Sequence, residues 1–174
     1  MKLELYYPAK PFLVTQGWGI YNPAYERFGF NRHNGVDFLP GTKKLVYAPV
    51  RMRVYAVDFN EGAGNFVSGV TTQKWEVGGI ECFVQLTFMH LEKALCKIGD
   101  ILEIGDLIGV PDNTGFSTGP HTHMAPYRLT EALLKMDSND ANGSFDPSPY
   151  WNGYFAEDVN IMKQIISLLQ RAVN

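Results

Sequence analysis

Two segments of the chain alternate between apolar residues and other residues, and this pattern constrains the fold more than any other feature. Apolar side chains recur at every second position from Tyr47 to Val57, and again from Cys82 to Phe88. A period of two is that of a β-strand with one buried face. The second series continues in register to His90, so we predict that this histidine belongs to the inward-facing set.

The remaining segments predict short elements. Residues Asn60–Gly79 are rich in Gly and Thr and indicate either a hairpin excursion or a long loop. Gly-Asp turns open two short apolar pieces, Ile98–Leu102 and Ile104–Gly109, which we interpret as two short strands. Thr130–Met136 is predicted as a short helix capped by Thr130.

Only the C-terminus has a clear helical period, because Val159, Met162, Ile166 and Leu169 fall on one stripe. We therefore predict a mainly β fold with an antiparallel sheet core and a C-terminal α-helix. One domain is expected over residues 1–157, with the amphipathic helix of residues 158–174 packed on the same domain.

Composition excludes several classes of partner. The chain of 174 residues has a net charge of -3 and therefore lacks the basic surplus of a nucleic-acid-binding protein. No apolar run approaches the roughly eighteen residues of a membrane-spanning helix. The N-terminus lacks the pattern of a signal peptide, so no conventional export is expected. Cys82 and Cys96 form no CxxC pair and are expected to be free thiols.

The four histidines fall in three places that suit metal chemistry: His33 with Asp37, then His90, then His121 with His123. Residues two apart on a strand face the same side, so His121 and His123 can enter one pocket. Catalytic zinc commonly takes three protein ligands from imidazoles and carboxylates and keeps a fourth position for water. Each motif alone also fits a plainer interpretation. His33 and Asp37 could be only a hydrogen-bonded pair, and His121 and His123 could be two exposed imidazoles on a surface strand. His90 could be a core histidine with its hydrogen bonds satisfied.

The motifs taken together are far more specific than any one of them. They are Thr15–Gly19, His33–Asp37, Met89–Leu91, Gly105–Gly109 and Asn113–His123. In order, spacing and residue type this set resembles the lysostaphin-type (LytM, M23) peptidases over roughly Pro11 to Tyr127. The resemblance implies the lysostaphin-type, duplicated hybrid motif-like fold, an antiparallel β-sheet with a groove floored by the metal.

The resemblance also implies roles for individual residues. It makes His33, Asp37 and His123 the ligands of one Zn²⁺ per chain and makes His90 and His121 catalytic. Zinc would activate water and polarise the scissile carbonyl, while the two imidazoles would accept a proton and stabilise the oxyanion. The sequence does not divide these two tasks between them. Tyr25 is the nearest candidate for a tyrosine that some relatives use, with ordinary loop packing as the alternative.

The implied activity is that of a zinc metalloendopeptidase on stem peptides or cross-links of bacterial peptidoglycan. Such an enzyme acts at the cell wall or periplasm, and without a visible signal peptide it would be virion-associated or released from the cytoplasm at lysis. An Asp146–Tyr150 ending resembles phage and prophage members, so phage particle proteins are possible partners. The alternative is a non-catalytic relative that binds cell wall or serves as a virion component, although such relatives typically lose metal ligands.

The sequence departs from the family pattern directly after the His-x-His pair. Met124–Tyr127 stands where relatives usually have an apolar residue, Phe and an acidic or small residue. No predicted ligand is affected. We therefore expect the departure to change the shape of the groove and not the metal site.

Overall fold

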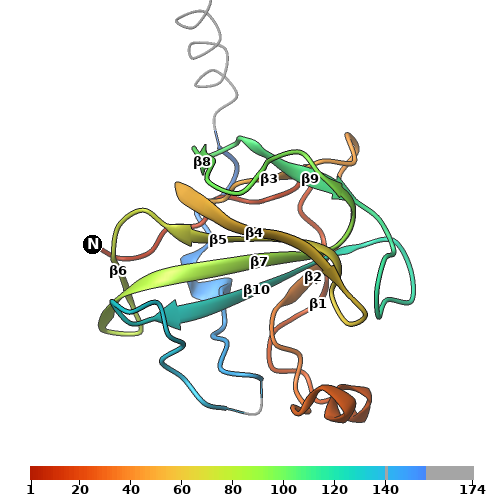
Figure 1. The fold of residues 1–174 in the computed structure, drawn as a ribbon, viewed down its shortest axis with the longest axis horizontal. Coiled ribbons are helices and arrows are strands. Elements are labelled where there is room, and N and C mark those ends of the chain that lie inside the picture. Colours follow the sequence, from red (N-terminus) through yellow and green to blue (C-terminus); the bar gives the residue numbers. More distant parts are fainter. Residues whose placement is uncertain (140, 156–174) are drawn as a thin grey trace, which may run out of the picture.

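An antiparallel β-sheet dominates the computed structural model, which describes residues 1–139 and 141–155 (Figure 1). The strands are β1 (Val14–Gln16), β2 (Val36–Phe38), β3 (Val46–Tyr47), β4 (Met52–Asn60), β5 (Gly64–Thr71), β6 (Trp75–Val77), β7 (Ile80–Ala94), β8 (Ile101–Leu102), β9 (Leu107–Pro111) and β10 (Thr122–Leu129). The main path through the sheet is β1-β2-β10-β7-β5-β4-β8, and β3, β6 and β9 branch from it. The predicted mainly β, antiparallel fold is confirmed.

Two short 3-10 helices, η1 (Pro23–Phe28) and η2 (Ser148–Tyr150), interrupt the loops of this sheet. Asn22 caps η1, because its side-chain oxygen accepts from the backbone N–H of Ala24. Pro23 follows the cap at a position where its missing N–H costs nothing. The coil of η1 lies below the sheet in Figure 1, beside the ends of β1 and β2.

The alternating segments form strands whose bounds differ from the prediction. The first is divided, since β3 ends at Tyr47 and β4 begins only at Met52, with Pro49 between them. The second is longer than predicted and runs as β7 through His90 to Ala94. The Gly-Asp turns do precede two short strands, β8 and β9, each starting a few residues later than expected.

Residues Asn60–Gly79 are not a long loop, because they supply the second strand of a β4–β5 hairpin and then strand β6. The segment turns between Asn60 and Gly64 and returns as β5, an inner strand hydrogen-bonded to β4 on one side and β7 on the other. Gly69 and Ser68 take buried positions in this strand. Small residues at buried positions give no apolar alternation, which explains why the sequence pattern did not reveal β5.

The predicted helix over Thr130–Met136 is wrong. The chain turns sharply instead, with Leu133 in the left-handed region at φ 58°, and Lys135 pairs back with Leu129. Thr130 still acts as a cap of this turn, because its hydroxyl accepts from the backbone N–H of Leu134 at 3.2 Å. Pairing with the end of β10 therefore overrides the helical propensity of the segment.

The main hydrophobic core lies on one face of the sheet and joins residues from both ends of the described chain. Leu5, Phe38, Phe88, Met124 and Phe145 all belong to it. A smaller cluster on the other face of β10 contains Ala125, Tyr127 and Leu129. Because successive residues of a strand point to opposite faces, β10 is buried on both sides.

The predicted helix of residues 158–174 lies outside the described residues, and so does the predicted domain end at residue 157. Cys82 and Cys96 are free thiols, as expected. Within residues 1–139 and 141–155, no helix has the length and apolar character needed to cross a membrane.

Candidate active site

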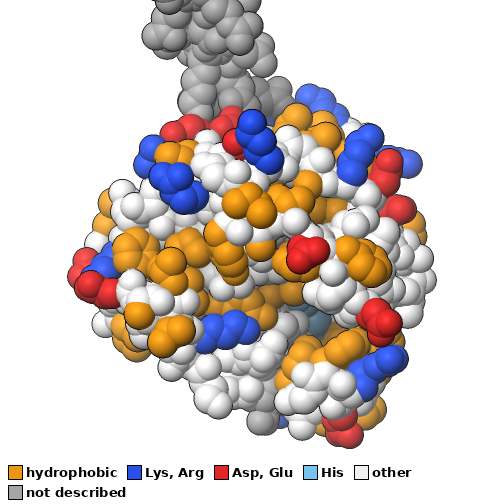
Figure 2. Space-filling model, in the orientation of Figure 1, with side chains coloured by type: hydrophobic (Ala, Val, Ile, Leu, Met, Phe, Trp, Pro, Cys, Tyr) orange, Lys and Arg blue, Asp and Glu red, His pale blue; other side chains and the backbone are white. Residues whose placement is uncertain are grey.

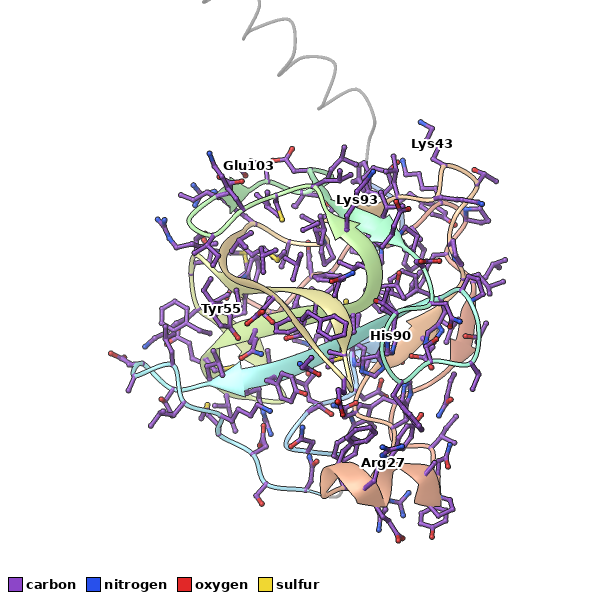
Figure 3. All side chains as sticks on the ribbon, turned by 45° about the vertical axis from the view of Figure 1, so that its right-hand side comes forward. Arg27, Lys43, Tyr55, His90, Lys93 and Glu103 are labelled. Carbon is purple, nitrogen blue, oxygen red and sulfur yellow. The ribbon has the colours of Figure 1, made fainter. Side chains whose placement is uncertain are left out.

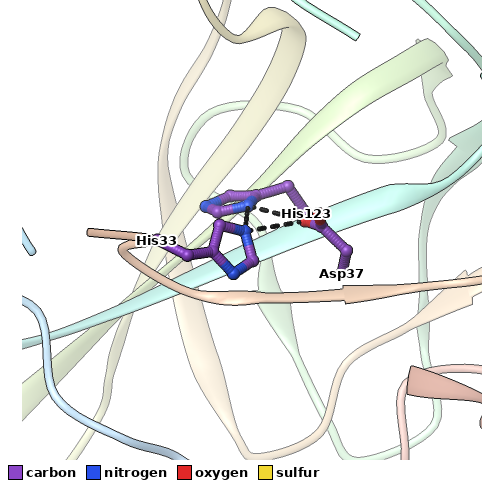
Figure 4. Close-up of side chains that lie close together, drawn as sticks. All are labelled: His33, Asp37 and His123. Atoms are coloured by element: carbon purple, nitrogen blue, oxygen red, sulfur yellow. Dashed lines mark hydrogen bonds and ion pairs between the residues drawn. The ribbon is translucent and has the colours of Figure 1, made fainter. Parts of the chain in front are cut away.

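Three predicted metal ligands converge at the junction of β2 and β10. Nε2 of His33 lies 3.1 Å from Oδ1 of Asp37 and 2.9 Å from Nδ1 of His123, and the last two atoms are 2.8 Å apart (Figure 4). All three residues are buried. The structure therefore brings together the three residues that the resemblance implied.

Strand pairing accounts for this convergence. In the antiparallel ladder between β2 and β10, Asp37 stands directly opposite His123. Side chains of residues opposite each other share a face of the sheet and approach closely. His33 arrives from the loop before β2, where its backbone N–H donates to the carbonyl of Ile20.

Hydrogen bonding leaves a nitrogen lone pair of His33 directed into the cluster. Nδ1 of His33 donates to the carbonyl of Gly17 at 2.8 Å, and since a carbonyl only accepts, the ring proton must reside on Nδ1. Nε2 is then a bare acceptor facing Asp37 and His123. Three acceptor atoms this close repel one another unless a proton or a cation lies between them. The donor set of two imidazole nitrogens and one carboxylate oxygen fits a zinc ion.

The charge states of the cluster also suit a cation. Burial alone would raise the pKa of Asp37, but the neighbouring imidazoles of His123 and His33 outweigh it and hold the pKa well below its usual range. Burial lowers the pKa of His123. A carboxylate and neutral imidazoles are the forms in which these side chains bind metals.

His90 reaches the same site through an unusual backbone conformation. Its φ is 63°, in the left-handed region that non-glycine residues rarely adopt. Phe88 lies in the main core, whereas His90 lines the pocket together with Met89. The predicted burial of His90 is confirmed. Its left-handed backbone, however, interrupts the alternation of side chains along β7, so the imidazole faces the pocket and not the hydrophobic core.

The ring of His90 is held by the loop before β10. Nδ1 donates to the carbonyl of Thr114 at 2.8 Å, which leaves Nε2 without a proton when the ring is neutral. Burial, followed by the nearby His123, lowers the pKa of His90 to about 4. His90 therefore enters the site as a neutral imidazole.

His121 is held in the same way from its own loop. Nδ1 donates to the carbonyl of Gly119 at 2.8 Å, and Nε2 lies 3.7 Å from Oδ1 of Asp37. The ring centroids of His121 and His90 are 4.8 Å apart. Two imidazoles outside the three-residue cluster thus stand side by side next to it.

The five residues line one pocket of about 460 Å³. Figure 2 shows a histidine at the bottom of a hollow, with apolar side chains around it. Aromatic rings form one wall: Tyr25, Phe28 and Phe30 come from η1 and the following loop, and Phe116 comes from the loop before β10. Figure 3 shows Arg27 on η1 and His90 on the sheet above it. Among the residues that the structure describes, Asp37 is the only charged one other than histidine that lines the pocket.

Tyr25 contacts a predicted ligand. Its ring stacks on that of His33 with centroids 5.8 Å apart, and its hydroxyl accepts from Nε2 of Gln16 at 3.1 Å. Burial, followed by the charge of Asp37, raises the pKa of Tyr25. The phenol therefore stays protonated at the edge of the pocket, where it can donate a hydrogen bond.

Sequence reasoning assigned no role to three residues that shape the site. The carbonyls of Gly17 and Thr114 orient His33 and His90, and Gly35 allows β10 to approach the first motif. Two of these roles belong to backbone atoms, so no side-chain signal could have revealed them. The role of Gly35 could have been inferred from its position between the predicted ligands His33 and Asp37.

Comparison with known sequences decides the family. Residues 31–134 match the sequence profile of Peptidase family M23, and this range contains all five histidine and aspartate residues of the site. The chain belongs to peptidase family M23. Membership in M23 places it among the hydrolases.

Curated proteins similar to this chain include an enzyme of a staphylococcus. The glycyl-glycine endopeptidase ALE-1 of Staphylococcus capitis is 32% identical over 136 residues, which are 78% of this chain and 33% of that protein. The chain spans only about a fifth to a third of the length of the first curated relatives that it matches.

Solved structures of M23 peptidases have the same fold. The catalytic domain of lysostaphin from Staphylococcus simulans aligns with a TM-score of 0.59 at 24% identity, covering 80% of this chain and 92% of that one. A zinc-containing peptidase from Vibrio cholerae aligns with a TM-score of 0.55 at 27% identity, covering 72% of this chain and 37% of that one. The sheet described above is therefore the fold of the lysostaphin catalytic domain.

Proposed function

We propose that this chain is a zinc-dependent endopeptidase that hydrolyses peptide bonds in the stem peptides or cross-links of bacterial peptidoglycan. One observation carries the proposal: three ligand-type side chains and two further imidazoles meet at the floor of one pocket in a chain of family M23. In this proposal His33, Asp37 and His123 hold the metal, and His90 and His121 are catalytic.

The three ligands supply two nitrogens and one oxygen, as in many catalytic zinc sites. When bound, zinc acts as a Lewis acid that polarises the scissile carbonyl and makes water a stronger nucleophile. Gly17 fixes the ring of His33 by accepting its Nδ1 proton, so the ligand nitrogen needs no rearrangement. The zinc content of a relative, the Vibrio cholerae peptidase, supports the choice of metal.

His90 and His121 are suited to proton transfer. Both donate Nδ1–H to a backbone carbonyl, so both present a free Nε2 when neutral. A neutral imidazole can accept the proton of an attacking water, and the protonated ring can then return it to the leaving amine. The second imidazole, when protonated at Nε2, would donate a hydrogen bond to the negative charge that develops on the carbonyl oxygen.

Peptidoglycan is proposed as the substrate because one relative, ShyB of Vibrio cholerae, is named a peptidoglycan DD-endopeptidase. ALE-1 is named for cleavage between glycines, and lysostaphin is named as an antimicrobial peptidase. We accordingly infer that the chain works at the bacterial cell wall. Its pocket opens at the protein surface, as access to a polymer requires (Figure 2).

Digestion of purified sacculi from several bacteria, followed by mass analysis of the soluble products, tests this function. We expect release of products with newly cleaved peptide bonds and intact glycan linkages. A matched digestion with the His121→Ala variant controls for contaminating hydrolases. Release of sugar fragments alone, or no release from any sacculus, would contradict the proposal.

A further inference from the structure

Tyr127, one of the four residues that depart from the family pattern, lies beside a cation at the edge of the pocket. Tyr127 is 3% exposed and lines the pocket, and its hydroxyl accepts from Nδ2 of Asn34, the neighbour of ligand His33. Nζ of Lys135 lies 3.6 Å from the centroid of the Tyr127 ring. One tyrosine side chain therefore connects the metal-site loop to an ammonium group.

The position of Lys135 is defined by several contacts. Its backbone pairs with Leu129 at the end of β10, and its Nζ donates to the carbonyl of Asn142 at 3.5 Å. Asn142 also lines the pocket. The ammonium group thus lies between two pocket-lining residues, on the sharp turn that replaces the expected helix.

Lys135 differs from the other cations of this region in having no carboxylate partner. Arg128 binds Asp137 through two nitrogens, and Lys74 binds Glu131. Within residues 1–139 and 141–155, no carboxylate lies within ion-pair distance of Lys135. Lys135 is an exposed residue, but its ammonium group packs on the Tyr127 ring, and this partial burial lowers its pKa without an anion to compensate. An arriving carboxylate would supply that compensation.

We propose that Lys135 recognises a carboxylate of the peptide substrate, so that the enzyme selects acidic peptides over their amidated counterparts. The inference rests on the proposed peptidase function and names its substrate class. Among residues 1–139 and 141–155, Asp37 is the only acidic residue that lines the pocket, so no other described lining side chain repels such a carboxylate. The cation–π contact with Tyr127 holds the ammonium group at the edge of the pocket while its outer side stays available.

The test compares two forms of one cross-linked stem-peptide dimer, with its α-carboxylates free or converted to carboxamides. Both kcat/KM and the equilibrium binding constant are measured for each form. We expect the wild-type chain to prefer the acidic dimer by about tenfold, the scale of one charge-assisted hydrogen bond at a partly exposed site. The preference should decrease at high salt.

Three variants assign the preference to Lys135. Lys135→Gln should bring the acid-to-amide ratio close to one, and Lys135→Arg should restore it. Lys43→Gln removes a charge far from His90 in Figure 3 and should keep the wild-type ratio. Thermal melting of each variant checks that Lys135→Gln is folded. If it is not, the acid-to-amide ratio of Lys135→Arg tests whether a cation at this position gives the preference.

An unchanged ratio in Lys135→Gln, or no preference in the wild type, would overturn the assignment. Failure of the proposed function would look different, because the wild type would then cleave neither dimer nor purified sacculi. In that case the equilibrium binding constants alone test whether Lys135 recognises a carboxylate. A binding preference for the acidic dimer that depends on Lys135 supports the site, and equal binding of both forms refutes it.

Discussion

Gly35 lies directly against the imidazole of His123. A Cβ atom at position 35 would stand 2.8 Å from Nε2 of His123 and 2.3 Å from the carbonyl oxygen of Met124. Neither contact can be relieved cheaply, because one neighbour is backbone and the other is a buried ring. The glycine between His33 and Asp37 is therefore what lets the first metal motif pack against the strand that carries the second.

Replacing Gly35 with Ala should separate these two motifs. We expect a loss of about 1–3 kcal/mol in the free energy of unfolding, the usual cost of overpacking, together with weaker metal binding. Urea denaturation and a metal titration measure the two effects. Gly119→Ala is the matched control for stability, because a Cβ there meets no atom within 4 Å. Equal stability of the two variants would contradict the close approach.

Replacing His121 with Ala should remove catalysis and leave the metal in place. The ring lies outside the three-ligand cluster, and its Nε2 is free to exchange a proton. We expect the rate of peptide cleavage to decrease by about 10²–10⁴-fold, the range for loss of a general acid or base. Cleavage assays and metal analysis of the same preparation test this. Loss of metal together with activity would instead make His121 a ligand.

Thr114 is expected to position His90 without touching the substrate. Its hydroxyl donates to the carbonyl of Leu91 and accepts from the N–H of Asn65, and its own carbonyl holds the ring of His90. Thr114→Val removes both hydroxyl contacts, so kcat should decrease severalfold while KM and metal content stay near wild type.

Thr114→Ser keeps the hydroxyl and should recover most of the lost kcat. A crystal structure or histidine NMR signals of the Val variant should report a shifted His90 ring. A Ser variant as slow as the Val variant would contradict this positioning role.

The sequence predicted the chemistry of the site better than its geometry. His33, Asp37, His121 and His123 could be selected together only because the motifs that contain them resemble those of the lysostaphin-type peptidases, and strand pairing then places Asp37 opposite His123. His90 was correctly expected to be buried, but its left-handed backbone depends on contacts with Ala63 and Asp112, far from it in sequence. The alternation of apolar residues along one strand does not indicate such long-range contacts.

The sequence pattern did not predict two elements of the fold, for similar reasons. Strand β5 has Gly and Ser at buried positions, where the neighbouring Met52 and Thr87 fill the space, so its own residues give no apolar pattern. The segment after β10 has helical composition, but Lys135 pairs with Leu129 and a turn results. In both cases tertiary contacts decide what local propensity leaves open.

The two thiols should be poorly reactive in the folded chain. Burial, followed by the charge of Asp100, raises the pKa of Cys96 to about 11, and Cys82 is 2% exposed. At pH 8 the thiolate fraction of Cys96 is then small, and it should increase as pH approaches 11. Labelling with a thiol reagent should be slow in native protein and fast in denaturant. Rapid native labelling at pH 8 would contradict the burial of these residues.

Metal analysis tests the proposed zinc site most directly. We expect about one zinc ion per chain in protein purified without chelator. Replacing His33 or Asp37 with Ala should abolish this zinc, because each removes one of the three atoms that converge between β2 and β10. Stoichiometric zinc that survives both substitutions would contradict the proposed site.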